Sequence, residues 1–109
     1  KIILSNLIGN AMKYQDTEKE ERTVSVSARL IAREWHLTVR DNGIGIAPAY
    51  KHKVFNMFFR ASEKSSGSGL GLYIVQEAVL KLGGAVGVES EPGKGSVFTV
   101  IFPAQKVTA

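Results

Sequence analysis

Amide, carboxylate and glycine residues fall in four short clusters that together predict a nucleotide site. In chain order the clusters run from Asn6 to Tyr14, Asp41 to Gly45, Phe55 to Arg60 and Gly67 to Gly71. An amide oxygen is a hard ligand that suits Mg²⁺, a buried carboxylate needs a donor partner, and glycines before a helix expose backbone N–H groups to phosphate. Each motif alone arises often by chance, so the interpretation depends on their combination and order.

Asp41 is predicted to be buried at the end of a strand. Leu37 and Val39 alternate with polar residues, and Asp41 continues their side of the strand. An unpartnered buried carboxylate is unfavourable, and the Gly43 and Gly45 that follow would let a ligand approach the backbone closely enough to supply a donor. A carboxylate that caps the turn or pairs with an arginine is the alternative interpretation.

Residues 1–14 have the spacing of an amphipathic helix, with Asn6, Asn10 and Lys13 on its polar face and Tyr14 at its end. The Asn10 amide would suit Mg²⁺ once phosphate oxygens and water complete the octahedron, and Lys13 would add a positive charge near the phosphates. An ordinary polar helix face is the alternative for this segment alone. The apolar stripe that should face a core contains Leu4, Leu7, Ile8 and Ala11.

Residues 42–69 show little periodicity, and a long loop within a small domain is usually functional. Its Ser/Gly-rich end predicts a mobile lid over residues 61–69. The apolar residues Phe55, Met57, Phe58 and Phe59 predict instead that part of the loop is anchored against the domain or a partner. Arg60 could stabilise charge in phosphoryl transfer or be a surface arginine stacked on Phe.

The glycines from Gly67 to Gly71 lie at the start of a predicted helix, where free N–H groups and the helix dipole favour phosphate. Gly71 could instead permit close packing of the helix on a sheet. The helix itself is predicted over residues 70–82, and Gly83 with Gly84 would supply a left-handed C-cap.

The remaining pattern predicts two hairpins and an α+β fold. A half-buried strand is expected over residues 23–30 and a second strand over 34–41, and strand-like runs over 85–90 and 96–102 flank Pro92-Gly93, which suits a type II turn. The expected architecture is a two-layer α/β sandwich, with helices on one face of a mixed sheet of at least four strands.

Composition indicates one soluble domain over residues 1–109. The chain has no cysteine and no apolar run near the ~20 residues that span a bilayer, so we expect no direct membrane contact. Its net charge of +4 comes from basic residues that are scattered among acidic ones, which argues against nucleic acid. The start in a helical pattern without Met suggests a fragment of a longer chain. His36 and His52 are interpreted as ordinary surface residues.

The clusters and the tail from Gly83 to Pro103 resemble the ATP-binding catalytic domain of a sensor histidine kinase, within the GHKL group of ATPases. The resemblance covers residues from about 2 to 103. It implies the GHKL type of sandwich with a flexible ATP lid, Mg-ATP as the ligand, Asn10 as the metal ligand and Asp41 as the acceptor of the adenine amine. It assigns Asn6, Lys13 and Arg60 to catalysis. The residues that it assigns to nucleotide binding are Asn6, Asn10, Lys13, Tyr14, Asp41, Gly43, Gly45, Ile46, Phe59, Arg60, Gly67, Ser68, Gly69, Leu70, Gly71 and Leu72.

The resemblance also implies partners. In the intact, homodimeric protein the γ-phosphoryl group would pass to a histidine on a separate dimerisation domain, and from there to the receiver domain of a response regulator. No acceptor-histidine motif occurs in this chain, so we expect it to bind nucleotide and turn it over slowly. The domain would be cytoplasmic, in a parent that is either membrane-anchored or soluble.

Two other functions are compatible with the sequence. One is a GHKL ATPase that uses nucleotide to close a dimer, which would need a water-activating Glu upstream or where Asn6 stands. The other is a silent module that senses nucleotide or docks a partner without catalysis; Asn10, Asp41 and the glycines of the second cluster argue against it.

Overall fold

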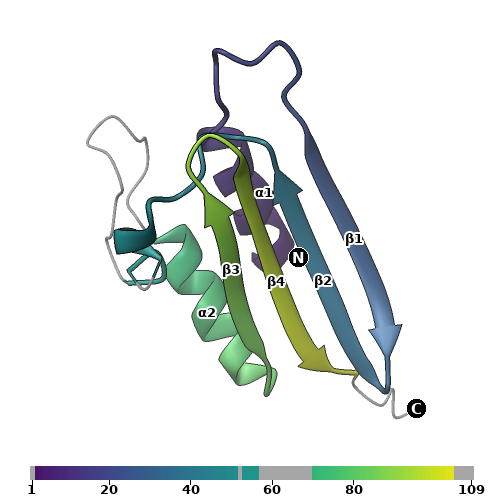
Figure 1. The fold of residues 1–109 in the computed structure, drawn as a ribbon. Coiled ribbons are helices and arrows are strands. Elements are labelled where there is room, and N and C mark those ends of the chain that lie inside the picture. Colours follow the sequence, from purple (N-terminus) through teal and green to yellow (C-terminus); the bar gives the residue numbers. More distant parts are fainter. Residues whose placement is uncertain (1, 52, 57–69, 105–109) are drawn as a thin grey trace.

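The computed structural model describes residues 2–51, 53–56 and 70–104. Two helices lie against one face of a four-stranded sheet and form a two-layer sandwich (Figure 1). This confirms the predicted α+β class. The elements are α1 (Ile2–Lys13), β1 (Val24–Ile31), β2 (Glu34–Asp41), the short 3-10 helix η1 (Pro48–Tyr50), α2 (Gly71–Lys81), β3 (Ala85–Glu91) and β4 (Gly95–Pro103). Neither α-helix of the described ranges is long and apolar enough to cross a membrane.

The sheet has the strand order β1-β2-β4-β3, and each neighbouring pair is antiparallel. The expectation of a mixed sheet was therefore wrong for the described strands. β2 and β3 do run in the same direction, but β4 lies between them and runs against both (Figure 1). The register aligns Val39 with Phe98 and Phe98 with Val88, so inward-facing side chains form continuous rows across three strands.

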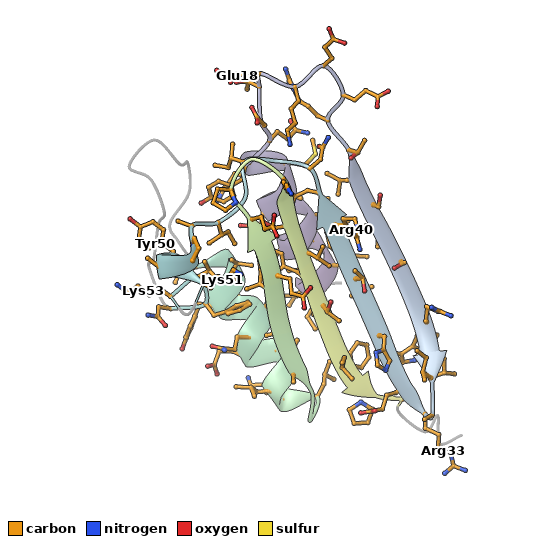
Figure 2. All side chains as sticks on the ribbon, viewed as in Figure 1. Glu18, Arg33, Arg40, Tyr50, Lys51 and Lys53 are labelled. Carbon is orange, nitrogen blue, oxygen red and sulfur yellow. The ribbon has the colours of Figure 1, made fainter. Side chains whose placement is uncertain are left out.

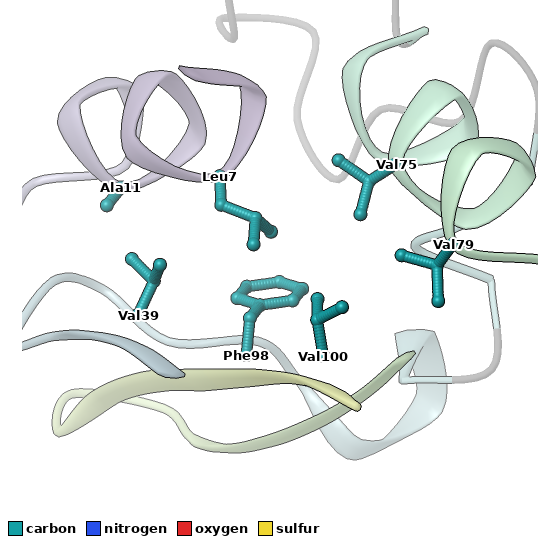
Figure 3. Close-up of a cluster of buried hydrophobic side chains, with 7 residues drawn as sticks. All are labelled: Leu7, Ala11, Val39, Val75, Val79, Phe98 and Val100. Carbon is teal, nitrogen blue, oxygen red and sulfur yellow. The ribbon is translucent and has the colours of Figure 1, made fainter. Parts of the chain in front are cut away.

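The core lies between the helices and the centre of the sheet (Figure 3). Apolar residues one helical turn apart on each helix meet apolar residues at alternate positions on the strands, as their 3.6- and 2-residue periods require. Full burial of a valine, leucine or phenylalanine side chain contributes about 1.5–3 kcal/mol relative to exposure. The fully buried members are Leu7 and Ala11 of α1, Val75 and Val79 of α2, and Val39, Phe98 and Val100 of the sheet.

β1 is an edge strand that the helices leave largely uncovered. We expected its Val24, Val26, Ala28 and Leu30 to be half-buried, but only Val24 is, and Val26 and Leu30 are 45% and 56% exposed. The alternation does place these residues on the helix side, opposite Asp41, Val39, Leu37 and Trp35. Burial fails because the described helices cover β2, β4 and β3 instead (Figure 1).

The predicted turns and cap are present. Ala32 and Arg33 form a two-residue loop with φ of 49° and 66°, the conformation of a type I′ hairpin turn. Gly93 has φ of 80° in the second hairpin, where Lys94 donates to the carbonyl of Glu91, as a type II turn requires. Gly83, with φ of 77°, ends α2 in the left-handed conformation.

Candidate nucleotide site

Asp41 ends β2 on the helix side of the sheet and is only 8% exposed, as its position in the alternation predicted. The backbone N–H of Gly43 donates to Oδ1 at 2.9 Å, and the Ser96 backbone also hydrogen-bonds to the carboxylate. Burial raises the pKa of the Asp41 carboxyl, against the lowering effect of these hydrogen bonds and of the Lys19 charge. The Gly43 hydrogen bond caps the turn, as the alternative interpretation expects, and a buried carboxyl with a raised pKa is in addition a candidate for ligand binding.

The loop after Asp41 is held so closely to the end of α1 that only glycine fits at Gly43. A Cβ there would overlap the carbonyl oxygen of Tyr14 and lie 2.9 Å from Oδ1 of Asp41. The same Tyr14 carbonyl accepts a hydrogen bond from the N–H of Ile44 at 3.0 Å. The close approach thus joins two predicted site segments, the end of the first helix and the Asp41 loop.

Gly45 makes the second close approach, to the β3–β4 hairpin. Its φ is 77°, and a Cβ would overlap the carbonyl oxygen of Glu91. The next residue, Ile46, donates its N–H to the hydroxyl of Ser90 at 2.7 Å, and Ser90 donates to the carbonyl of Gly95 at 2.8 Å. The Asp41 loop is therefore fixed on both sides, by α1 and by the hairpin.

The two helices bring Asn6 next to Gly71. A Cβ at Gly71 would lie 3.3 Å from Oδ1 of Asn6, so a larger residue would crowd the amide. The Nδ2 group of Asn6 donates a hydrogen bond to the carbonyl of Ile2 at 2.8 Å, and the Oδ1 atom of Asn6 faces the start of α2. The N-cap residue of α2, Leu70, makes no side-chain cap hydrogen bond, and the N–H groups of a helix start are a site that favours an anion.

The other predicted site residues of the first cluster lie in the second half of α1 and directly after it. Asn10 and Tyr14 are half-buried and Lys13 is exposed. Further along the chain, Ile46 and Leu72 are partly buried and pack against the core cluster. The structure therefore joins the first cluster to the second through Tyr14 and to the fourth through Asn6, and among the described residues it shows no hydrogen bond from the side chains of Asn10 or Lys13 to these segments.

Five predicted site residues lie outside the described ranges. They are Phe59, Arg60, Gly67, Ser68 and Gly69, and the prediction of a mobile lid over residues 61–69 also falls there. Of the aromatic cluster the structure describes Phe55. Its ring meets that of Phe98 edge to face at a centroid distance of 6.0 Å, which confirms the expected anchor of this segment on the core.

An open hollow of ≈ 690 Å³ lies at the same end of the sheet. Its lining includes Asp41, but Arg40, Glu89 and Val97 have the opposite parity along their strands and belong to the sheet face away from the helices. Asn6, Asn10 and Gly71 are not among its lining residues. We therefore place the candidate site on the helix side, between α1, the start of α2 and the Asp41 loop.

A family model described as Histidine kinase-, DNA gyrase B-, and HSP90-like ATPase matches residues 1–106. The chain belongs to this ATPase family. The sensor-like histidine kinase SenX3 of Mycobacterium tuberculosis is 41% identical over 105 residues, a match that covers 93% of this chain and 25% of SenX3. The chain spans a quarter or less of the length of SenX3 and of the curated sensor histidine kinases AtsR and RppB, which it also matches.

Solved structures of sensor histidine kinases have the same fold as this ATPase domain. The mycobacterial sensor histidine kinase MprB matches with a TM-score of 0.81 and 32% identity, over 97% of this chain and 72% of that one. Full-length ShkA, solved in complex with AMPPNP, also has a TM-score of 0.81, with 35% identity over 99% of this chain and 22% of ShkA. The fold and the kinase family expected from the sequence are confirmed.

Two residues of this ATPase domain that support the site were missed by the sequence reasoning. Ser90 continues the inward side of β3 after Val86 and Val88, so its burial beside the site could have been inferred from alternation. Lys19 could not, because it stands in a run of charged residues that is typical of a solvated loop.

Proposed function

We propose that this domain binds Mg-ATP and, in the intact sensor kinase, donates the γ-phosphoryl group to a histidine for relay to a response regulator. The proposal rests on the burial of the Asp41 carboxylate at the end of β2. The loop that follows it contains Gly43 and Gly45, which have no side chains and so leave the backbone accessible to close approach. Such a carboxylate would accept the exocyclic amine of adenine. The AMPPNP bound to the relative ShkA supports the choice of an adenine nucleotide.

The triphosphate would lie between the polar face of α1 and the start of α2. Asn6 and Gly71 are neighbours there, and the uncapped N–H groups of α2 favour an anion. Lys13 would approach the phosphates as a point charge, and Arg60, which lies outside the described residues, would stabilise charge as the phosphoryl group transfers. Catalysis would consist mainly of positioning.

Mg²⁺ fits this arrangement as a cation held mostly by the nucleotide. No group of three His, Cys, Asp or Glu residues in the described ranges could hold a metal ion. Mg²⁺ often keeps several waters and takes only one or two protein ligands beside phosphate oxygens, and the neutral amide of Asn10 suits that role. The bound ion would neutralise charge on the phosphates.

The phosphoacceptor would come from outside this chain. His36 lies on the sheet face away from the helices, because its parity along β2 is opposite to that of Val39 and Asp41. We therefore assign the acceptor to a dimerisation domain of the same parent protein, with the receiver domain of a response regulator as the next partner. The parent would be a homodimer whose catalytic domain works in the cytoplasm.

Calorimetric titration with AMPPNP and with the matching guanine analogue tests the base assignment. The wild-type chain should prefer the adenine analogue, because guanine presents a carbonyl where adenine presents an amine. Asp41→Asn should weaken AMPPNP binding about tenfold or more, the value of a hydrogen bond to a charged group, and should erase the preference. Glu89→Gln, an exposed charge change on the opposite sheet face, is the matched control. Unchanged affinity in Asp41→Asn would refute the assignment.

Magnesium and phosphotransfer need separate measurements. Titrations with and without Mg²⁺ should show a magnesium-dependent gain in affinity that Asn10→Ala removes while binding without metal persists. In the intact kinase, Asp41→Asn and Asn10→Ala should each reduce incorporation of labelled γ-phosphate into histidine. A folded chain that binds no adenine nucleotide, or an intact kinase whose labelling ignores both substitutions, would contradict the proposal.

A further inference from the structure

Lys19 makes two contacts that its sequence context does not suggest. Its Nζ lies 2.7 Å from the carbonyl oxygen of Asn42 and 2.7 Å from the carbonyl oxygen of Gly93. These acceptors are 23 and 74 residues away along the chain. A lysine is usually solvated, so two short charge-assisted bonds to distant backbone carbonyls indicate a specific position.

Both acceptors belong to the segments that fix Asp41. Asn42 stands between Asp41 and Gly43, and Gly93 is in the turn of the β3–β4 hairpin. The two segments are also joined directly, because the N–H of Gly93 donates to the carbonyl of Ile44 at 2.8 Å. Lys19 therefore lies at the point where the segment after α1, the Asp41 loop and the hairpin meet.

The Asn42 side chain strengthens the same junction from the other direction. Its Oδ1 accepts the N–H of Thr23 at 2.8 Å, and its Nδ2 donates to the carbonyl of Glu21 at 2.8 Å. The segment from Lys19 to Thr23 and the residue after Asp41 are thus linked by backbone and side-chain bonds together. The charge of Lys19 also acts on Asp41, where it opposes the rise in the carboxyl pKa that burial causes.

We propose that Lys19 is a positioning residue for the base of the nucleotide, because its ammonium group holds the Asp41 loop against the β3–β4 hairpin in the arrangement that presents the carboxylate. This inference rests on the proposed function. Lys19 itself does not contact the nucleotide in this scheme. Loss of the ammonium group should therefore weaken binding of the adenine base. It should not change how much the phosphates and Mg²⁺ contribute to nucleotide affinity.

The test uses Lys19→Met, which keeps most of the aliphatic stem and removes the ammonium group. We expect its affinity for adenosine and for AMPPNP to fall by the same factor, about tenfold, with a smaller adenine-over-guanine preference. The magnesium-dependent gain should stay as in the wild type. Lys19→Arg, which retains donors that can reach two carbonyls, should recover most of the affinity. Lys81→Met, an exposed lysine at the end of α2, should bind as the wild type does.

Hydrogen exchange provides a second readout that does not depend on nucleotide. In Lys19→Met the amides of Ile44 and Gly93 should exchange faster, while that of Gly84, which donates to Val79 at the far end of α2, should not change. A variant that lowers only the unfolding midpoint, with affinity and base preference intact, would show a purely structural role and overturn the inference. Failure of the folded wild-type chain to bind nucleotide would overturn the proposed function and this role together, so the two failures are distinguishable.

Discussion

The closeness of Gly45 to the β3–β4 hairpin can be tested by adding a single methyl group. Gly45→Ala would place an L-residue at φ of 77° and its Cβ against the Glu91 carbonyl. The left-handed conformation costs about 1–2 kcal/mol. Separation of the two segments would in addition break the Ile46–Ser90 and Gly93–Ile44 hydrogen bonds, at about 0.5–1.5 kcal/mol each. We expect the free energy of unfolding to fall by about 2–5 kcal/mol, a large part of the 5–15 kcal/mol typical of a domain.

Substitutions at three other glycines separate the cost of a positive φ from the cost of the steric overlap. Gly93→Ala has a φ of 80° but open space around the new Cβ, so it should cost about 1–2 kcal/mol. Gly43→Ala meets the Tyr14 carbonyl without a positive φ and so reports the steric term alone. Gly87→Ala, in β3, meets neither condition and should be neutral or stabilise by about 0.5–1 kcal/mol.

Urea unfolding of the four variants at one pH gives their free energies of unfolding. These can be compared when the dependence of the free energy on urea concentration has the same slope in all four. Gly45→Ala should be the least stable of the four, because it alone among them combines a positive φ with an overlap with the backbone. If Gly45→Ala were no worse than Gly93→Ala, the Asp41 loop would not lie against the hairpin as described. Nucleotide affinity, measured well below the unfolding midpoint, should fall in Gly43→Ala and Gly45→Ala and stay unchanged in Gly87→Ala.

Three further predictions concern the junction and the opposite end of the sheet. Burial raises the pKa of Asp41 in the folded state, so folding is accompanied by binding of a proton to this carboxyl between the two pKa values. The stability that Asp41 contributes is therefore present below its unfolded pKa and is lost as pH rises through its folded pKa. Urea unfolding without nucleotide should therefore show Asp41→Asn gaining on the wild type between acid and neutral pH; a constant difference would refute the sign. Ser90→Ala should cost about 1–3 kcal/mol in the same assay, since the Ile46 N–H loses its acceptor, and Ser25→Ala, an exposed control in β1, should cost little. The double variant Ala32→Asn/Arg33→Gly should raise thermal stability by about 1 kcal/mol because both positions have positive φ, and a lower melting temperature would exclude the type I′ assignment.

Local pattern predicted most of the elements and the burial of Asp41. The helical stripe that contains Leu7 and Ala11, and the alternation that ends at Asp41, both survive in the structure because the same period decides which side chains face the core. The positive φ of Gly83 and Gly93 likewise follows from residue type, since glycine adopts that conformation without steric cost.

What local pattern could not predict depends on which elements become neighbours. Alternation in β1 identifies the side on which Val26 and Leu30 lie, but not whether a helix covers them. The antiparallel sheet depends on the insertion of β4 between β2 and β3, which no single segment encodes. The contacts of Lys19 could not be predicted for the same reason, because its two acceptors belong to loops that come together only in the folded chain.

The type I′ turn at Ala32 and Arg33 lies at the opposite end of the sheet from the Asp41 junction (Figure 2). The side chain of Arg33 extends outward there, and the chain contains no cysteine. A single cysteine introduced at residue 33 would therefore accept one fluorophore at a known place, far from the loops on which nucleotide binding is proposed to depend. Paired with a second dye on the proposed dimerisation domain, it would report by energy transfer the distance between the two domains while the candidate site stays chemically unmodified.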